Sequence, residues 1–397
     1  AYFTVQARAA SVLALTVTVF LVGWMTTRRF GILAGATAAL SLALMPRVFA
    51  HGRIANIESL VGMFFTATVL FTADRWPSLY VPWSSTSRSR WSIPWIPTVI
   101  TGFLLGLTLL TKIQGVLFPV PFAVWAIWQF GWRGCTGIAI VGLISAMVLF
   151  IGWPWLWSDP LAHFREYLGQ GSRDHLYCWY LGRRFLDSDV PWHFPYVIFI
   201  TTVPLGILAM GIVGIAGRNA NGHAGWRDES LQLILAVILF SLSLFAVPKV
   251  TVYDNERLFL VAYPLWAVLA GRGAACLTHW IQNPRVGRWL LTGLLLSESY
   301  TLVTLNPCQL SYYSWLVGGL SGADRLGLEP TYWADSITRD FQAEIVRLLP
   351  EGSTLHVAPV LHPLQLPGMS LQSPQFQQHR IHLASWDDRI RSEVRYV

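Results

Sequence analysis

Four polar clusters in this chain carry residue types that could do chemistry, and the first surrounds Glu58. Residues 46–59 read PRVFAHGRIANIES and end at the start of an apolar stretch. A carboxylate there could face a polar cavity and bind a metal ion or orient a sugar. Beside it, Arg53 is a candidate phosphate ligand and His51 a candidate substrate-binding residue. The structural alternative is that Glu58 only stabilises the N-terminus of a helix.

The second cluster, LLTKIQG at residues 109–115, places Lys112 at the end of a long apolar segment. A lysine is a compact point charge, which suits contact with a phosphate, and Gln114 two residues later is a candidate substrate-binding residue. The alternative is snorkelling, in which a long cationic side chain reaches interfacial water from the end of a helix. A second lysine with the same two readings, Lys249, ends another apolar stretch.

The third cluster, YDNER at residues 253–257, combines an arginine with two acids. Arg257 could bind two phosphate oxygens with its planar guanidinium, and Tyr253 is a candidate substrate-binding residue. Asp254 or Glu256 could instead simply neutralise the arginine. In that case the cluster is a solvated charged turn.

The fourth cluster is the loop at residues 158–194, which holds aromatic residues and histidines, among them His163, His175 and Tyr180. Such residues suit stacking on carbohydrate, and His193 is a candidate substrate-binding residue. However, Trp and Tyr also collect at membrane interfaces for physical reasons alone. Residues 160–168 have the spacing of a short amphipathic helix that lies on the membrane.

Segments that cross a membrane must position these clusters. Only 12% of the 397 residues are charged and 54% are hydrophobic, whereas a soluble domain is about one quarter charged. Ten apolar stretches follow one another, at residues 10–25, 30–45, 60–73, 96–111, 115–132, 136–157, 195–216, 231–247, 258–270 and 289–305. Because backbone polar groups in lipid must be satisfied internally, we predict an all-α bundle of about ten spans over residues 1–305.

If each stretch crosses once, the four clusters lie in alternate gaps and therefore on one side. The opposite gaps hold eleven arginines against nine cations on the cluster side, so the positive-inside rule makes the arginine-rich side cytoplasmic. These arginines form no basic run, so the net charge of +7 does not indicate a nucleic-acid partner. They are Arg28, Arg29, Arg75, Arg88, Arg90, Arg133, Arg218, Arg227, Arg272, Arg285 and Arg288.

Residues 306–397 are predicted to form a small, incomplete extracytoplasmic α/β segment, with a helix over 336–349 and a strand over 354–360. Because the chain begins without Met and shows no signal peptide, we expect a fragment that lacks at least its beginning. Glu298 lies within the tenth apolar stretch. It is expected to pair with a cation on a neighbouring helix, unless that stretch is less deeply inserted.

Taken in order, the motifs resemble those of a known family. That family is the bacterial branch of the GT-C glycosyltransferases, relatives of the protein O-mannosyltransferases and of the aminoarabinose transferase that modifies lipid A. The motifs are MPRVFAHGRIANIES, GLTLLTKIQG, GWPWLWSDP, WYLG with PWHFP and TVP, and YDNERLFLVAYPLWAVLAG. The stretch LSYYSWLVGG followed by GADRLGLEPTYWAD is similar to the segment after the last spans of large bacterial members.

The resemblance implies a hexosyl- or pentosyltransferase of the bacterial cytoplasmic membrane. Such an enzyme moves a sugar with inversion from a polyprenyl-phosphate carrier to a protein, lipid or glycan acceptor at the outer face. Glu58 would correspond to the second acidic position of the family, near the donor or a Mg²⁺ or Mn²⁺ ion, and Lys112 and Arg257 to cations near the carrier phosphate. The catalytic Asp of the family follows its first span, so it is expected upstream of Ala1.

Two other classes remain open. A lipid or glycolipid transporter or flippase would place binding groups near the bilayer midplane, where Glu298 is the candidate in this chain. A non-catalytic subunit that binds glycolipid would lack an acid in the first outer loop.

Overall fold

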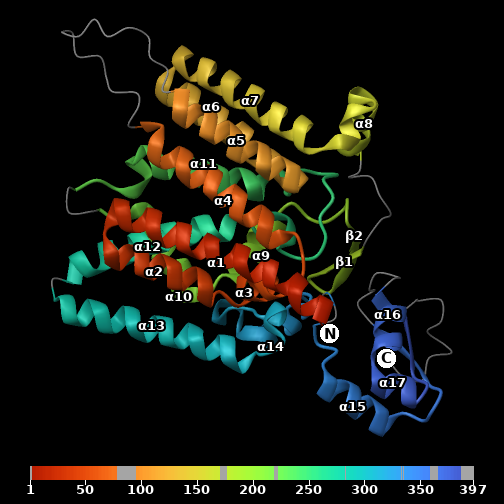
Figure 1. Cartoon of the computed structure of the whole chain (residues 1–397). Coiled ribbons are helices and arrows are strands. Elements are labelled where there is room, and N and C mark those ends of the chain that lie inside the picture. The colour runs from red at the N-terminus through yellow and green to blue at the C-terminus, as the bar shows by residue number, and fades with distance from the viewer. Residues whose placement is uncertain are drawn as a thin grey trace, which may run out of the picture.

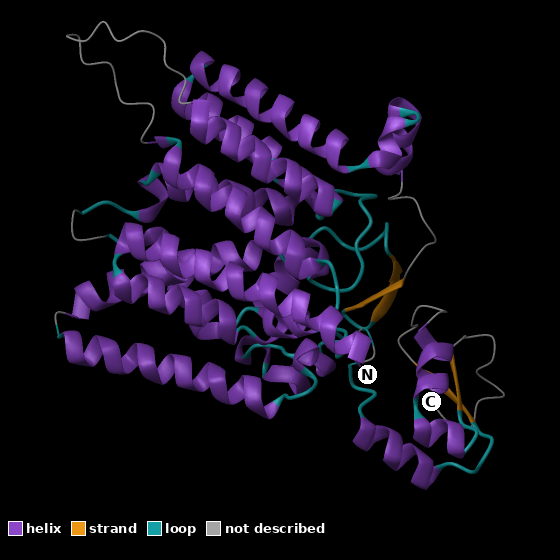
Figure 2. Cartoon of the chain, viewed as in Figure 1, coloured by secondary structure: helices purple, strands orange, loops and turns teal. Residues whose placement is uncertain are grey.

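The computed structural model describes residues 2–77, 95–169, 177–218, 222–281, 283–331, 333, 335–357 and 365–385. Within them, each predicted apolar stretch forms one helix or a pair of consecutive helices (Figures 1 and 2). The main helices are α1 (Tyr2–Phe30), α2 (Ile32–Leu44), α3 (Pro46–Arg53), α4 (Glu58–Arg75), α5 (Trp95–Thr111), α6 (Pro119–Phe130), α7 (Trp132–Gly152), α9 (Phe194–Thr202), α10 (Leu205–Ala216), α11 (Glu229–Leu244), α12 (Ala262–Ile281) and α13 (Pro284–Thr304). The prediction of a mostly helical bundle is confirmed.

Helices able to cross a membrane are fewer than the ten predicted spans. Three segments of the described chain are long and apolar enough by themselves: Gln6–Phe30, Ile113–Phe130 and Trp132–Gly152. Two bent pairs raise the number to five if each pair is one span, and α5 and α11 are shorter apolar helices. Ten crossings therefore remain a prediction.

The two bent pairs have prolines at their breaks. Helices α2 and α3 meet at 66°, and Pro46 is the first residue of α3. Helices α9 and α10 meet at 110°, where Pro204 directly precedes α10. A proline lacks the backbone N–H that would continue the preceding helix, so the chain turns at these points. The first bend directs α3 toward the cluster around Glu58.

Helix α12 lies at the centre of the bundle and packs against α10, α2 and α1. It approaches α10 closely because Gly214 of α10 faces α12 and Gly273 of α12 faces α10. A Cβ atom added at either glycine would collide with a backbone oxygen of the other helix. The helix extends beyond the apolar stretch that ends at residue 270, because α12 continues to Ile281. The prediction that Arg272 lies in a loop is therefore wrong, and its buried guanidinium donates to the carbonyls of Gly214, Gly217 and His223.

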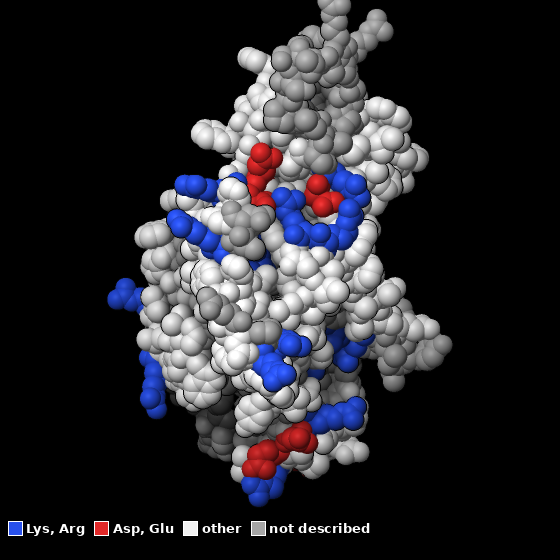
Figure 3. Space-filling model, turned by 90° about the vertical axis from the view of Figure 1, so that its left-hand side faces the viewer, with Lys and Arg blue, Asp and Glu red and all other residues white. Residues whose placement is uncertain are grey.

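The connections between helices separate into two ends, as alternate crossings require. At one end lie the α1–α2, α6–α7 and α12–α13 turns (Figure 1). Figure 3 views this end and shows more Lys and Arg than Asp and Glu. Arg28 and Arg75 both pair there with Asp74. At the opposite end lie α3, α14 (Gly319–Arg325), the helix α8 (Pro160–Gly169) and an antiparallel hairpin of β1 (Tyr177–Tyr180) and β2 (Arg183–Leu186). The predicted clustering of polar motifs at one end is therefore seen in the fold.

A small unit follows the bundle. It consists of α15 (Arg339–Leu348), β3 (Thr354–Val357), α16 (Gln365–Gln372), α17 (Pro374–Gln378) and β4 (His382–Ser385), with β3 and β4 parallel. Its apolar core is separate from that of the bundle and includes Leu355, Phe376 and Leu383. The predicted helix and strand are both present. Residues 358–360 of that strand, residues 386–397, His175 and most of the 74–95 connection lie outside the described residues.

Candidate functional site

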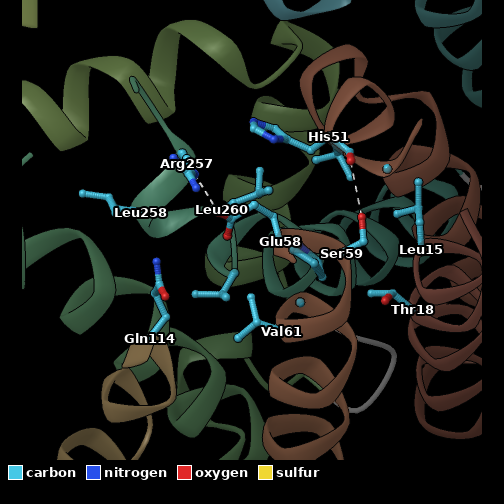
Figure 4. A pocket seen from close by; sticks show the side chains of 15 residues that line it. Leu15, Thr18, His51, Glu58, Ser59, Val61, Gln114, Arg257, Leu258 and Leu260 are labelled. Carbon is cyan, nitrogen blue, oxygen red and sulfur yellow. Dashed lines mark hydrogen bonds and ion pairs between the residues drawn. The ribbon is translucent and has the colours of Figure 1, made fainter. Parts of the chain in front are cut away.

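Glu58 is the point where three segments distant in sequence meet. Its carboxylate is buried, and Oε1 accepts hydrogen bonds from Lys112 Nζ at 2.5 Å and from Arg257 Nε at 2.6 Å. In Figure 4, Arg257 and Glu58 point toward one another. The structure therefore brings together the three residues that the sequence proposed as acid and phosphate-binding cations.

Local backbone structure places each of these side chains. The Asn56 side-chain oxygen accepts from the Glu58 N–H at 3.1 Å, at the first turn of α4. The backbone of Lys112 is extended (φ −163°), and this conformation ends α5. The 3-10 helix Ile113–Leu117 follows directly. Arg257 follows Asp254 and Asn255, whose left-handed φ angles of 55° and 50° turn the chain back toward α4.

Two carboxylates balance the two cations of the cluster, since Lys112 and Arg257 both contact Glu58 and Arg257 also pairs with Asp254. Burial lowers the pKa of Lys112, although the adjacent Glu58 carboxylate opposes this effect. Burial also acts to lower the pKa of Arg257, but Glu58 and Asp254 together hold it above its usual value. Asp254 Oδ2 accepts from Arg257 Nη1 at 2.7 Å. Both cations are thus held in place and partly withdrawn from water, as preorganised anion-binding groups must be.

A second ion pair lies beside the first and was missed from the sequence. Arg47 of α3 donates to Glu256 Oε2 at 2.5 Å and to the Tyr312 carbonyl at 2.9 Å, and both charged side chains are fully buried. His51 Nε2 lies 3.5 Å from Glu256 Oε1. One signal was present, because residues 253–257 contain two acids and one arginine, so one acid needed a cation from elsewhere. Asp254 neutralises Arg257, whereas Glu256 pairs with Arg47.

A partly open pocket adjoins Glu58 and Arg257. Gln114 and His51, two of the residues proposed to bind substrate, also line it (Figure 4). The rest of its lining is mainly apolar and comes from α1, α3, α4 and the start of α12 with the residues just before it, and Leu15, Val61 and Pro264 are examples.

The remaining predicted residues lie near or away from this pocket. The Tyr253 ring is 5.8 Å from the Arg257 guanidinium carbon. Arg53 does not line the pocket, because it donates to the Asn306 side chain at 3.3 Å and to the Pro307 carbonyl. His193 is likewise outside it, with Nδ1 2.7 Å from the hydroxyl of Tyr180, whose pKa is raised to about 12, chiefly by burial. Lys249 pairs with Asp189 on the surface.

Binding of a metal ion at Glu58 stays a prediction. The only carboxylate oxygen of Glu58 with bonded partners is already held by two cations. Among the residues that the structure describes, no group of three or more His, Cys, Asp or Glu side chains is placed to hold a metal ion. The expected Mg²⁺ or Mn²⁺ therefore enters no step of the mechanism proposed below.

Comparison with known proteins gives one clear result. The structure resembles ArnT from Cupriavidus metallidurans in the apo state, with a TM-score of 0.52 and 14% sequence identity, over 96% of this chain and 71% of that chain. It also resembles ArnT from the same organism bound to undecaprenyl phosphate, with a TM-score of 0.50 and 14% identity, over 98% of this chain and 73% of that chain. No protein-family model and no curated protein matches the sequence. The chain therefore has the fold of ArnT.

Proposed function

We propose that the chain is a membrane glycosyltransferase that takes a sugar from a polyprenyl-phosphate carrier. It transfers the sugar with inversion to a protein, lipid or glycan acceptor at the extracytoplasmic face of the bacterial cytoplasmic membrane. The observation that carries the proposal is the convergence of Lys112 and Arg257 on one buried carboxylate, in a chain with the ArnT fold. One of the similar ArnT structures is bound to undecaprenyl phosphate.

The charges of the cluster suit the donor. A sugar phosphodiester carries one negative charge, and breaking the bond between sugar and phosphate leaves a phosphate that is nearly dianionic. Cations fixed at that phosphate bind the transition state more tightly than the ground state, which is the condition for catalysis. Lys112 and Arg257 would supply this stabilisation without reorganising, since Glu58 already holds both of them.

Apolar side chains beside the cluster suit the carrier chain. Ile57 and Leu60 flank Glu58 and are 44% and 40% exposed, and Ile113 and Val116 follow Lys112 with comparable exposure. In a membrane these side chains would contact lipid, so a prenyl chain could lie against them while its phosphate reaches the cations. This arrangement would admit the carrier from the bilayer and the acceptor from water.

The direct test is sugar transfer from a radiolabelled polyprenyl-phosphate sugar by membranes that contain the full-length protein. Lys112→Ala and Arg257→Ala should each lower transfer more than about tenfold, as expected for loss of a charge-assisted hydrogen bond worth roughly 1.5–3 kcal/mol. Lys249→Ala is the matched control, because its ammonium is exposed and pairs with Asp189 instead of Glu58. It should leave transfer unchanged.

Two outcomes would contradict the proposal. Unchanged turnover of both variants at saturating donor would remove the phosphate-binding assignment. Movement of labelled lipid across the bilayer, without consumption of any donor, would favour a flippase instead.

A further inference from the structure

The segment that follows α13 carries no role in the proposed function, yet one of its side chains contacts the proposed phosphate-binding arginine. The Trp333 ring lies 4.6 Å from the Arg257 guanidinium carbon, as in a cation–π contact. Its backbone has a left-handed φ of 57°, which is uncommon for a tryptophan. The ring of His51 meets the Trp333 ring edge to face at 5.4 Å.

Trp333 and Arg257 also share one carboxylate. Asp254 Oδ2 accepts from Trp333 Nε1 at 2.8 Å and from Arg257 Nη1 at 2.7 Å. The indole is therefore attached to the arginine twice, through its ring and through Asp254. These two contacts restrict rotation of the guanidinium in a way that neither would alone.

The neighbouring arginine has the same arrangement. Arg47 pairs with Glu256 of the 253–257 loop and lies 4.5 Å from the ring of Tyr313. Each arginine thus receives a carboxylate from the 253–257 loop and an aromatic ring from the segment after α13. Because the pattern occurs twice, this segment forms part of the site.

The donor atoms of Arg257 show what this arrangement achieves. Nε is bound to Glu58 and Nη1 to Asp254. Nη2 has no hydrogen bond to any residue that the structure describes. A planar guanidinium held at two nitrogens points the third in one direction. Nη2 is therefore the nitrogen of Arg257 whose two N–H groups are both left for a ligand.

We infer that Trp333 is a positioning residue, which holds Arg257 so that Nη2 faces the phosphate of the carrier lipid. The inference rests on the proposed function, because it takes Arg257 as a phosphate ligand. The inference gives the segment after α13 a role in binding the carrier lipid. The position of this segment outside the helical bundle does not by itself suggest such a role.

The test measures binding of undecaprenyl phosphate to the full-length protein in lipid nanodiscs. Trp333→Ala should weaken binding about tenfold, since it removes both the cation–π contact and the bond to Asp254. Trp333→Phe keeps the ring face but loses the bond to Asp254, so it should recover only part of that loss. Trp315→Ala is the matched control, because Trp315 lies in the same segment and is 76% exposed. It should bind as the unaltered protein does.

A double-mutant cycle separates positioning from a general structural effect. In the Arg257→Ala background, Trp333→Ala should cause no further loss of binding, because the group it positions is absent. If the loss of binding by Trp333→Ala adds in full to that by Arg257→Ala, the inference is overturned. It is also overturned if Trp333→Ala binds as the unaltered protein does while Arg257→Ala binds more weakly. Both results would leave the proposed function standing. Failure of the unaltered protein to bind undecaprenyl phosphate would overturn both proposals.

Discussion

Arg47 and Glu256 form an ion pair that is almost entirely removed from solvent, with 1% and 0% of their side chains exposed. Desolvating two charges is costly, and the cost is recovered only when both partners and their remaining hydrogen bonds are present. Here Arg47 also donates to the Tyr312 carbonyl and lies against the Tyr313 ring. The pair joins α3, the 253–257 loop and the segment after α13, so it fixes the frame around Glu58.

Glu256→Gln should therefore destabilise the protein by about 3–5 kcal/mol, because it leaves the Arg47 charge buried without its carboxylate. The measurement is chemical or thermal unfolding of the purified protein in detergent. Asp74→Asn is the matched control, since Asp74 pairs with Arg28 at 3.8 Å where the arginine is 39% exposed, and it should cost less than about 1 kcal/mol. Equal losses of stability for the two variants would show that burial of the Arg47–Glu256 pair does not increase its contribution to stability.

The site could be predicted from the sequence only in part, and the limit is physical. Glu58, Lys112 and Arg257 each stand at the edge of an apolar stretch, where a charge needs a partner or a ligand, and the structure joins them. Their pairing across almost 200 residues depends on how the helices pack, which periodicity does not encode. Trp333 was missed for the same reason, because a tryptophan in a polar segment has no local pattern that points to Arg257.

At the scale of the elements, small residues decide how closely helices approach. Gly102 and Gly106 lie one turn apart on α5 and face α7, where a Cβ at Gly106 would lie 2.5 Å from Val148 Cβ. In lipid, helices gain no hydrophobic free energy by associating, so close packing of this kind contributes directly to stability. Two threonine pairs join the same α5 to α4, Thr68 with Thr108 and Thr72 with Thr101, each at 3.2 Å.

Gly106→Ala should destabilise the bundle by roughly 1–3 kcal/mol, because α5 and α7 must separate to admit one methyl group. Gly142→Ala is the same change on α7 at a position where a Cβ would meet no atom within 4 Å, so it should be neutral or slightly stabilising. Unfolding in detergent measures both. A destabilised Gly142→Ala with an unaffected Gly106→Ala would contradict the packing argument.

The presence of these helices could be predicted because each apolar stretch is long and uninterrupted. The ends and the bends of the helices could not be predicted. Pro46 and Pro204 mark the two bends, but a proline can equally kink a helix, begin one or end one. Arg272 was wrongly predicted to lie in a loop because an arginine just after an apolar stretch looks like a loop residue in sequence. Three backbone carbonyls of the α10 end and the following loop satisfy its guanidinium within the bundle.

For the whole molecule, the arrangement of the two ends determines what the site can reach. The turn between α6 and α7 lies at the end that Figure 3 shows to be rich in Lys and Arg, and α8 lies at the other end with the Glu58 cluster (Figure 1). The two ends are joined by α7, whose 21 residues make a helix of about 31 Å at 1.5 Å per residue, the thickness of a bilayer's hydrocarbon core. Positions at the two ends of α7 should therefore face opposite aqueous compartments.

Two cysteine substitutions test this topology, in a full-length protein whose native cysteines have been replaced. Trp132→Cys, at the start of α7, should react with a membrane-impermeant maleimide only in inverted vesicles, because Trp132 is 89% exposed at the arginine-rich end and that end should be cytoplasmic. Glu166→Cys, exposed on the polar face of α8, should react only in intact spheroplasts. Labelling of both from one compartment would mean that α7 does not cross the membrane. If each cysteine is labelled from the compartment opposite to the one expected, the Glu58 cluster lies at the cytoplasmic face. The acceptor would then be a cytoplasmic molecule.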